Sequence, residues 1–179
     1  MLRGEEHHRV LKPVAGAVLI AALGGANPVA GQAPSPGGDV AFIADFAPSH
    51  ARVRRDTFDE PNWSGGDSFM KGIAKAEAHE CTVALYTRGA GQDFKIEVDF
   101  HHPLTLTRRS TPETLVFEGP EQAMRYWQIK WDHDTPAVTP GDATPLASLL
   151  LGLSNRDAGE RLSAASERAL AACGGAKAP

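Results

Sequence analysis

The sequence lacks the features that define several large classes of protein. It contains no Gly-x-Ser-x-Gly motif, no phosphate-binding loop and no dinucleotide-binding fingerprint. Its strongest apolar run, from Val14 to Leu23, is about ten residues long, whereas a membrane-spanning helix needs roughly twenty. These absences argue against a hydrolase with a nucleophile elbow, a nucleotide-binding enzyme and a membrane anchor.

Positive charge is not in excess either. The chain has 18 basic and 22 acidic residues, a net charge of −4. Without residues 1–30 the counts are 15 and 20, which makes the remainder slightly more acidic. Nucleic-acid-binding proteins normally carry a basic face, so the charge argues against that class.

Cysteine is scarce, with two residues in the whole chain. They do not form a Cys-x-x-Cys pair, and two distant cysteines are too few for a structural zinc site. In an oxidising compartment two such cysteines pair with each other. We therefore expect a disulfide between Cys81 and Cys173.

The N-terminus indicates that the protein reaches such a compartment. Residues 1–30 combine three basic residues with the short apolar run and then small residues around Ala30, which is typical of a cleaved secretory signal peptide. An amphipathic or disordered tail is the alternative, because Glu5 and Glu6 interrupt the basic part. Residues 31–39, rich in Pro, Gly and Ser, are predicted to form a flexible linker. The predicted location is periplasmic or secreted.

The clearest pattern in the mature part is a β-hairpin over residues 81–100. Its second half places apolar Phe94, Ile96, Val98 and Phe100 in strict alternation with charged residues and a histidine, the period of a half-buried strand. The Gly-rich residues 89–92 between the halves predict the turn. The opposite stripe, which begins at Lys95, is interpreted as solvated surface rather than an acid–base pair.

Further extended segments surround this hairpin. A strand is favoured over a helical turn at residues 40–47 and over a helix at 69–80, and shorter strands are expected at 104–107, 113–118 and 127–131. In the last of these, Trp127, Ile129 and Trp131 are expected on the buried face.

The C-terminal part changes to a helical period. Thr144 and Pro145 are typical of a helix start and predict a helix to Leu151, and a second helix is expected from Ser154 to Cys173, ended by two glycines. The sequence therefore predicts one α+β domain at residues 40–174, with an antiparallel sheet of about five to six strands packed by C-terminal helices. Residues 175–179 are expected to be a disordered tail.

Two polar clusters are candidate metal ligands. They are the adjacent pair His101 and His102, and the run Asp132, His133 and Asp134. Solvated turns are the alternative interpretation, because neighbouring side chains on a regular strand point to opposite faces. Trp63, in a loop rich in glycine and serine, is the aromatic residue expected to contact a partner.

One stretch resembles a known family. The order of Pro103, residues 115–119, Trp127 and residues 144–150 is similar to the middle of periplasmic lipoprotein-carrier proteins. That resemblance implies half-barrel strands before a Thr-Pro-Leu helix, but the family continues with strands where this chain is expected to end in a helix.

No catalytic residue is predicted. The sequence favours an exported, non-enzymatic binding or accessory protein whose partner is another exported protein. The alternative is a periplasmic protein that binds a metal or, like the lipoprotein carriers, a hydrophobic ligand.

Overall fold

The computed structural model describes residues 36–54, 57, 70–89 and 91–175. The chain divides into two units, residues 1–31 and 32–179, and all described residues belong to the second. The predicted signal peptide and Trp63 lie outside the described residues, so these two predictions stay open.

An antiparallel sheet forms most of the described part. Its strands are β1 (Ala51–Arg54), β2 (Met70–His79), β3 (Thr82–Arg88), β4 (Asp93–Asp99), β5 (Thr105–Ser110), β6 (Glu113–Glu118), β7 (Met124–Asp132), β8 (Thr135–Val138), β9 (Thr144–Pro145) and β10 (Ser148–Leu153). The order is β5-β6-β10-β1-β2-β3-β4-β7-β8, and β9 also pairs with β7. The α+β class is confirmed, but the expected five to six strands are wrong because the described sheet has ten.

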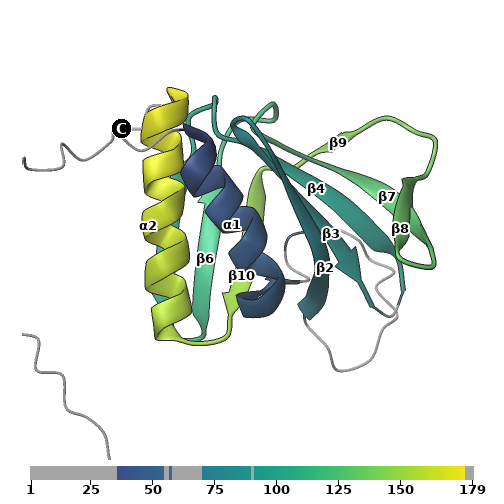
Figure 1. Ribbon diagram of the computed structural model, residues 1–179, viewed down its shortest axis with the longest axis horizontal. Coiled ribbons are helices and arrows are strands. Elements are labelled where there is room, and N and C mark those ends of the chain that lie inside the picture. The colour runs from purple at the N-terminus through teal and green to yellow at the C-terminus, as the bar shows by residue number, and fades with distance from the viewer. Residues whose placement is uncertain (1–35, 55–56, 58–69, 90, 176–179) are drawn as a thin grey trace, which may run out of the picture. The chain divides into compact units, whose positions relative to one another are not determined.

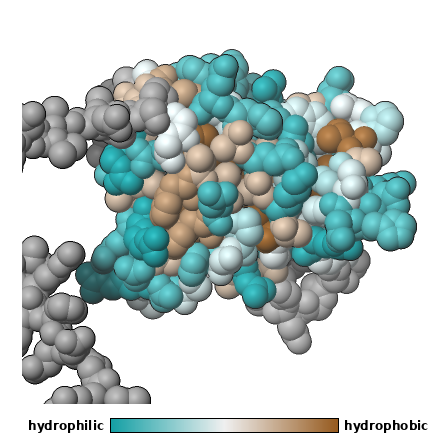
Figure 2. All heavy atoms as spheres, viewed as in Figure 1, coloured by the Kyte–Doolittle hydropathy of each residue, from teal (hydrophilic) through white to brown (hydrophobic). Residues whose placement is uncertain are grey.

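Two helices, α1 (Pro36–His50) and α2 (Arg156–Cys173), lie side by side on one face of this sheet (Figure 1). Apolar side chains remain partly exposed on them, and Figure 2 shows tan and brown atoms gathered over this face between hydrophilic side chains. Arg161 of α2 covers part of this surface, since its guanidinium lies 4.7 Å from the ring centre of Phe46 and 5.5 Å from that of Phe42. Neither helix, among the described residues, is long and apolar enough to cross a membrane.

Helix α1 corrects the strand predicted at residues 40–47. Val40, Ile43, Ala44 and Ala47 are buried, and their spacing of three and four residues is the helical period. The helix also includes the last four residues of the predicted linker, where Asp39 accepts two hydrogen bonds from Arg168 of α2 at 3.0 and 2.7 Å. Contacts with α2 and the sheet therefore determine the secondary structure of this segment, which is too short and too apolar to be assigned from its pattern alone.

The helix predicted from Thr144 to Leu151 is also wrong. This segment contains β9 and most of β10, and β10 lies inside the sheet with β6 on one side and β1 on the other. Leu149 and Leu151 point into the core, while Leu150 donates its backbone N–H to the hydroxyl of Thr57. The run of leucines at residues 149–151 is short and continuous, so periodicity does not distinguish a buried strand from a short buried helix.

The final helix is confirmed. Asn155, one residue after the expected start, caps it by accepting a hydrogen bond from the backbone N–H of Ala158 at 2.8 Å. Gly174 ends it with φ of 81°, a left-handed conformation that favours glycine.

The predicted hairpin and disulfide are confirmed as well. Phe94, Ile96 and Val98 of β4 are almost fully buried in the main core, and β4 pairs with β3 on one side. Cys81, in the turn between β2 and β3, is bonded to Cys173 at the end of α2, with Cα atoms 5.8 Å apart. The cross-link thus fixes the C-terminal helix to the centre of the sheet.

Strand β7 has the opposite orientation to the one expected. Met124 is fully buried in the core and Tyr126 packs against it, while Ile129 and Trp131 form a separate small cluster with Ala84 and Tyr86. The register with β4 explains this, since Val98 pairs with Met124 and Lys95 pairs with Trp127. The two tryptophans of β7 therefore lie on the outer face of the sheet.

Candidate functional site

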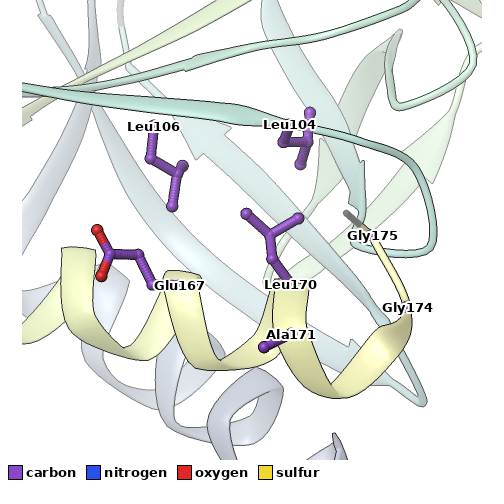
Figure 3. A pocket seen from close by; sticks show the side chains of 7 residues that line it. All are labelled: Leu104, Leu106, Glu167, Leu170, Ala171, Gly174 and Gly175. Atoms are coloured by element: carbon purple, nitrogen blue, oxygen red, sulfur yellow. The ribbon is translucent and has the colours of Figure 1, made fainter. Parts of the chain in front are cut away.

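The most apolar opening described in the structure is a groove between β5 and α2. It has a volume of about 400 Å³ and is lined by Leu104, Leu106, Glu167, Leu170, Ala171, Gly174 and Gly175. Figure 3 shows Leu104 and Leu106 projecting toward α2, with Leu170 projecting from α2 toward them. We call this opening the β5–α2 groove.

One wall of the groove consists of alternate residues at the start of β5, and the other consists of residues about one turn apart on α2. Leu104 and Leu106 are two residues apart and so share the face that looks toward α2. On α2, Glu167, Leu170 and Ala171 recur at three and four residues and so share one side of the helix. Leu104 and Leu170 are buried, Leu106 is half-buried, and Glu167 and Ala171 are exposed at the opening.

A group of charged residues joins β5 to β6 and to the first half of α2. Arg108 of β5 bonds to the carboxylate of Glu113 and lies 3.4 Å from that of Glu160 on α2. Glu113 raises the pKa of Arg108, and the pKa of Glu160 is lowered by its hydrogen bond to Arg156 and then by that to Arg108. Gly159 permits this contact, because a Cβ atom there would overlap the Glu113 carboxylate.

The end of α2, which the disulfide fixes to the sheet, borders the groove. Directly after Cys173, the chain turns at Gly174 and passes close to the loop that follows β4. A Cβ atom at Gly175 would overlap the carbonyl oxygens of Phe100 and His102. The groove therefore lies beside the C-terminal part of α2, which the disulfide and the contacts of Gly175 fix to the sheet.

Strand β5 is also an edge of the sheet. Within the described residues it pairs only with β6, over six consecutive residue pairs without a bulge. In an antiparallel strand, alternate residues direct their N–H and C=O groups to opposite sides. The backbone groups of about half of β5 are therefore directed away from β6, beside the opening of the groove.

Two further pockets, of about 360 and 210 Å³, are more polar in their lining. The larger lies where β10, β1 and β2 meet and includes Arg52, His50 and Ser154. The smaller lies beside β7 and β9 and includes Gln128 and Asp142. Neither has a wall of leucine side chains like that of the β5–α2 groove.

The charged stripe of β4 forms a paired network rather than a cavity. Lys95 lies 2.5 Å from Glu97, and its ammonium is 5.0 Å from the ring centre of Trp127. Beside it, Tyr86 donates a hydrogen bond to Glu77 at 2.7 Å, and Lys75 lies 2.7 Å from the same carboxylate group. Burial and then the Glu77 hydrogen bond raise the pKa of Tyr86 far above its usual range, while the hydrogen bonds from Lys75 and Tyr86 lower the pKa of Glu77.

The predicted metal ligands occupy two separate turns. His101 and His102 follow β4 and both contact Asp99, at 2.9 and 3.7 Å. Asp132, His133 and Asp134 lie at the exposed turn between β7 and β8. Because Val98 pairs with Met124 at the start of β7, the two clusters are separated by about 26 Å of strand.

These two clusters do not form one site. Across the part of the chain that the structure describes, no group of three or more His, Cys, Asp or Glu side chains is placed to hold a metal ion. Metal binding by either turn stays a prediction.

The β5–α2 groove was not predicted from the sequence. Its walls come from segments more than sixty residues apart, and a single sequence does not show which strand a helix packs against. The alternation of Leu104 and Leu106 with threonines was visible, but it indicates only that one face of the strand is covered.

Comparison with known proteins adds no relative: no protein-family model matches the chain, and neither a curated protein nor a solved structure does. The functional proposal therefore rests on the geometry of the groove.

Proposed function

We propose that this protein is an exported, non-enzymatic binding protein that holds an apolar part of its ligand in the β5–α2 groove. One observation carries the proposal: an opening of about 400 Å³ is walled by leucine side chains yet accessible from solvent. Pockets that bind ligands typically have volumes of about 300–1,000 Å³ and mostly apolar walls with few polar groups.

The chemistry of the lining favours binding over catalysis. Glu167 is the only ionisable side chain among the residues that line the groove. General acid–base and nucleophilic mechanisms use at least two positioned groups that exchange protons. An apolar wall with one exposed carboxylate at its rim instead suits a ligand that has an apolar part and a polar part.

The proposed location rests on the disulfide and the N-terminal sequence. The Cys81–Cys173 bond is typical of proteins in an oxidising compartment. The basic, apolar and small-residue parts of residues 1–30 supply the corresponding export signal. A periplasmic or secreted binding protein combines these two features.

The expected gain from binding is modest. Covering about 100 Å² of apolar surface contributes roughly 2.5 kcal/mol before the entropic cost of association. We therefore expect millimolar or weaker affinity for a small apolar probe and tighter binding for a ligand with further contacts.

Filling the groove tests the proposal. The probe is 1-anilinonaphthalene-8-sulfonate, whose fluorescence rises on apolar surfaces, added to the oxidised chain. Ala171→Phe places a ring in the opening, and we expect its affinity for the dye to fall about tenfold, equivalent to about 1.4 kcal/mol.

Ala164→Phe is the matched control, because it lies seven residues earlier on the same helix and does not line the groove. Unchanged dye binding in Ala171→Phe, or an equal loss in both variants, would show that the dye binds elsewhere and would contradict the proposal. Far-ultraviolet circular dichroism verifies that both variants are folded.

A further inference from the structure

We propose that the ligand of the groove is an extended polypeptide segment that pairs with β5 as an added strand and inserts an apolar side chain between β5 and α2. This inference rests on the proposed function and specifies its ligand class. It uses two neighbouring features of the structure, the free edge of β5 and the leucine-lined opening beside it.

The edge of β5 lacks several of the features that keep edge strands from pairing with other chains. Unpaired N–H and C=O groups on an edge strand pair readily with another extended chain, and proteins usually prevent this with very short strands, charged side chains, proline or bulges. β5 is six residues long, contains neither proline nor lysine, and pairs with β6 without a bulge. It is therefore neither short nor interrupted by proline or a bulge, and Arg108 and Arg109 are its only charged side chains.

The opposite edge of the sheet provides a comparison within the same molecule. β8 has four residues, including Pro136, which cannot donate a backbone hydrogen bond. Short length and proline are two of the usual protections. β5 has neither of these two protections.

The groove opens beside β5, on the face of the sheet that α2 covers. Side chains of an added strand alternate between its two faces, so every second one would lie on the side where Leu106 faces α2. A hydrocarbon chain could fill the groove but would leave the backbone groups of β5 without protein partners. An extended peptide occupies the groove and satisfies the edge, which is the usual mode of strand addition.

Charge indicates what the other face of the segment carries. Arg109 is exposed on β5, on the side away from the groove, and forms no ion pair with another described residue. Arg108, in contrast, is held by Glu113 and Glu160. A segment that alternates apolar and acidic residues would direct the former to the groove and the latter toward Arg109.

The test uses a synthetic peptide of this pattern. The probe is an acetylated, amidated and fluorescently labelled octapeptide in which leucine alternates with glutamate, and its binding to the oxidised full chain is measured by fluorescence anisotropy. Two derivatives carry N-methyl groups either on the leucine amides or on the glutamate amides. Only one set of amides faces β5 in an added strand, so we expect one derivative to bind at least tenfold more weakly and the other to bind within about threefold of the parent. Equal effects of both methylations would overturn backbone pairing.

Substitutions in β5 test where the peptide binds. Leu106→Ser and Arg109→Glu should each weaken binding at least about fivefold, through the apolar and the charged face respectively. The control is Val138→Ser, which removes an apolar side chain that is 46% exposed on the other edge strand. Equal weakening in Val138→Ser would overturn the assignment to β5.

Calorimetric titration with dodecanoate distinguishes failure of this inference from failure of the proposed function. Binding of dodecanoate, abolished by Ala171→Phe, without binding of the peptide would overturn the polypeptide ligand while supporting the groove as a binding site. Binding of neither the peptide nor dodecanoate would overturn both.

Discussion

Removal of the disulfide should be the most damaging small change to the stability of this protein. The bond joins residues 92 positions apart, and the loop-entropy relation for a ring of that size gives about 4.6 kcal/mol of stabilisation. Native domains have only about 5–15 kcal/mol in total. Loss of the bond should therefore bring the domain close to the limit at which it remains folded.

The disulfide is best removed in two ways. Cys81→Ala/Cys173→Ala removes the bond together with both sulfur atoms, and the wild-type chain treated with a phosphine reductant removes the bond alone. Because Cys81 is buried and Cys173 half-buried, the difference between the two measurements isolates the loss of packing. Both samples should unfold at a urea concentration lower by roughly 2 M, given a typical slope of about 2 kcal/mol per M.

Heat denaturation provides an independent measurement. A loss of about 4.6 kcal/mol corresponds to a melting temperature lower by roughly 10–18 °C for a domain of this size. Hydrogen exchange should also accelerate in the last turn of α2, which the bond holds against the sheet beside the groove. A stability loss below about 1 kcal/mol in both samples would refute the reasoning, because it would mean that the unfolded chain is already confined without the cross-link.

Three smaller perturbations follow from individual contacts. Asn155→Ala removes the cap of α2 and should cost about 1 kcal/mol in urea unfolding, whereas a cost near zero would contradict the capping role. Folding raises the pKa of Tyr86, so the protonated phenol stabilises the folded state. This stabilisation is complete below the ordinary tyrosine pKa of about 10 and is lost as the pH rises above it. The melting temperature of Tyr86→Phe should therefore fall less steeply than that of the wild type above pH 10, and parallel curves would contradict this. If calorimetry detects zinc binding, His101→Ala and His133→Ala should not both abolish it, since the two turns lie at opposite ends of β7.

The sequence alone was sufficient where a pattern is local. The hairpin of β3 and β4 follows from alternation around a glycine-rich turn, and the C-terminal helix follows from its period and its glycine end. The disulfide follows from the presence of two cysteines in a chain whose N-terminal sequence predicts export. In each case the physical cause acts within a few residues or leaves a single possible partner.

Tertiary structure decided the features that depend on neighbours distant in the chain. Val40–Ala47 is a helix because α2 and the sheet cover one side of it, and Ser148–Leu153 is a strand because β6 and β1 pair with both of its edges. Trp127 lies on the outer face because Val98 pairs with Met124 and so fixes the register of β7. A shift of one residue would reverse every side chain of that strand, and a single sequence does not specify it.

The candidate site also depends on contacts between residues that are distant in the chain. Leu104 and Leu106 identify a strand with one covered face, and Leu170 identifies a buried side of a helix, but only packing places them around one opening. Whether β5 is a central or an edge strand depends on the order of the whole sheet, which is set by pairings between segments far apart in the chain. The sequence by itself determined the fold class and the cross-link and predicted an exported protein, while the groove and the edge position of β5 among the described strands result from long-range pairing and packing that local patterns do not encode.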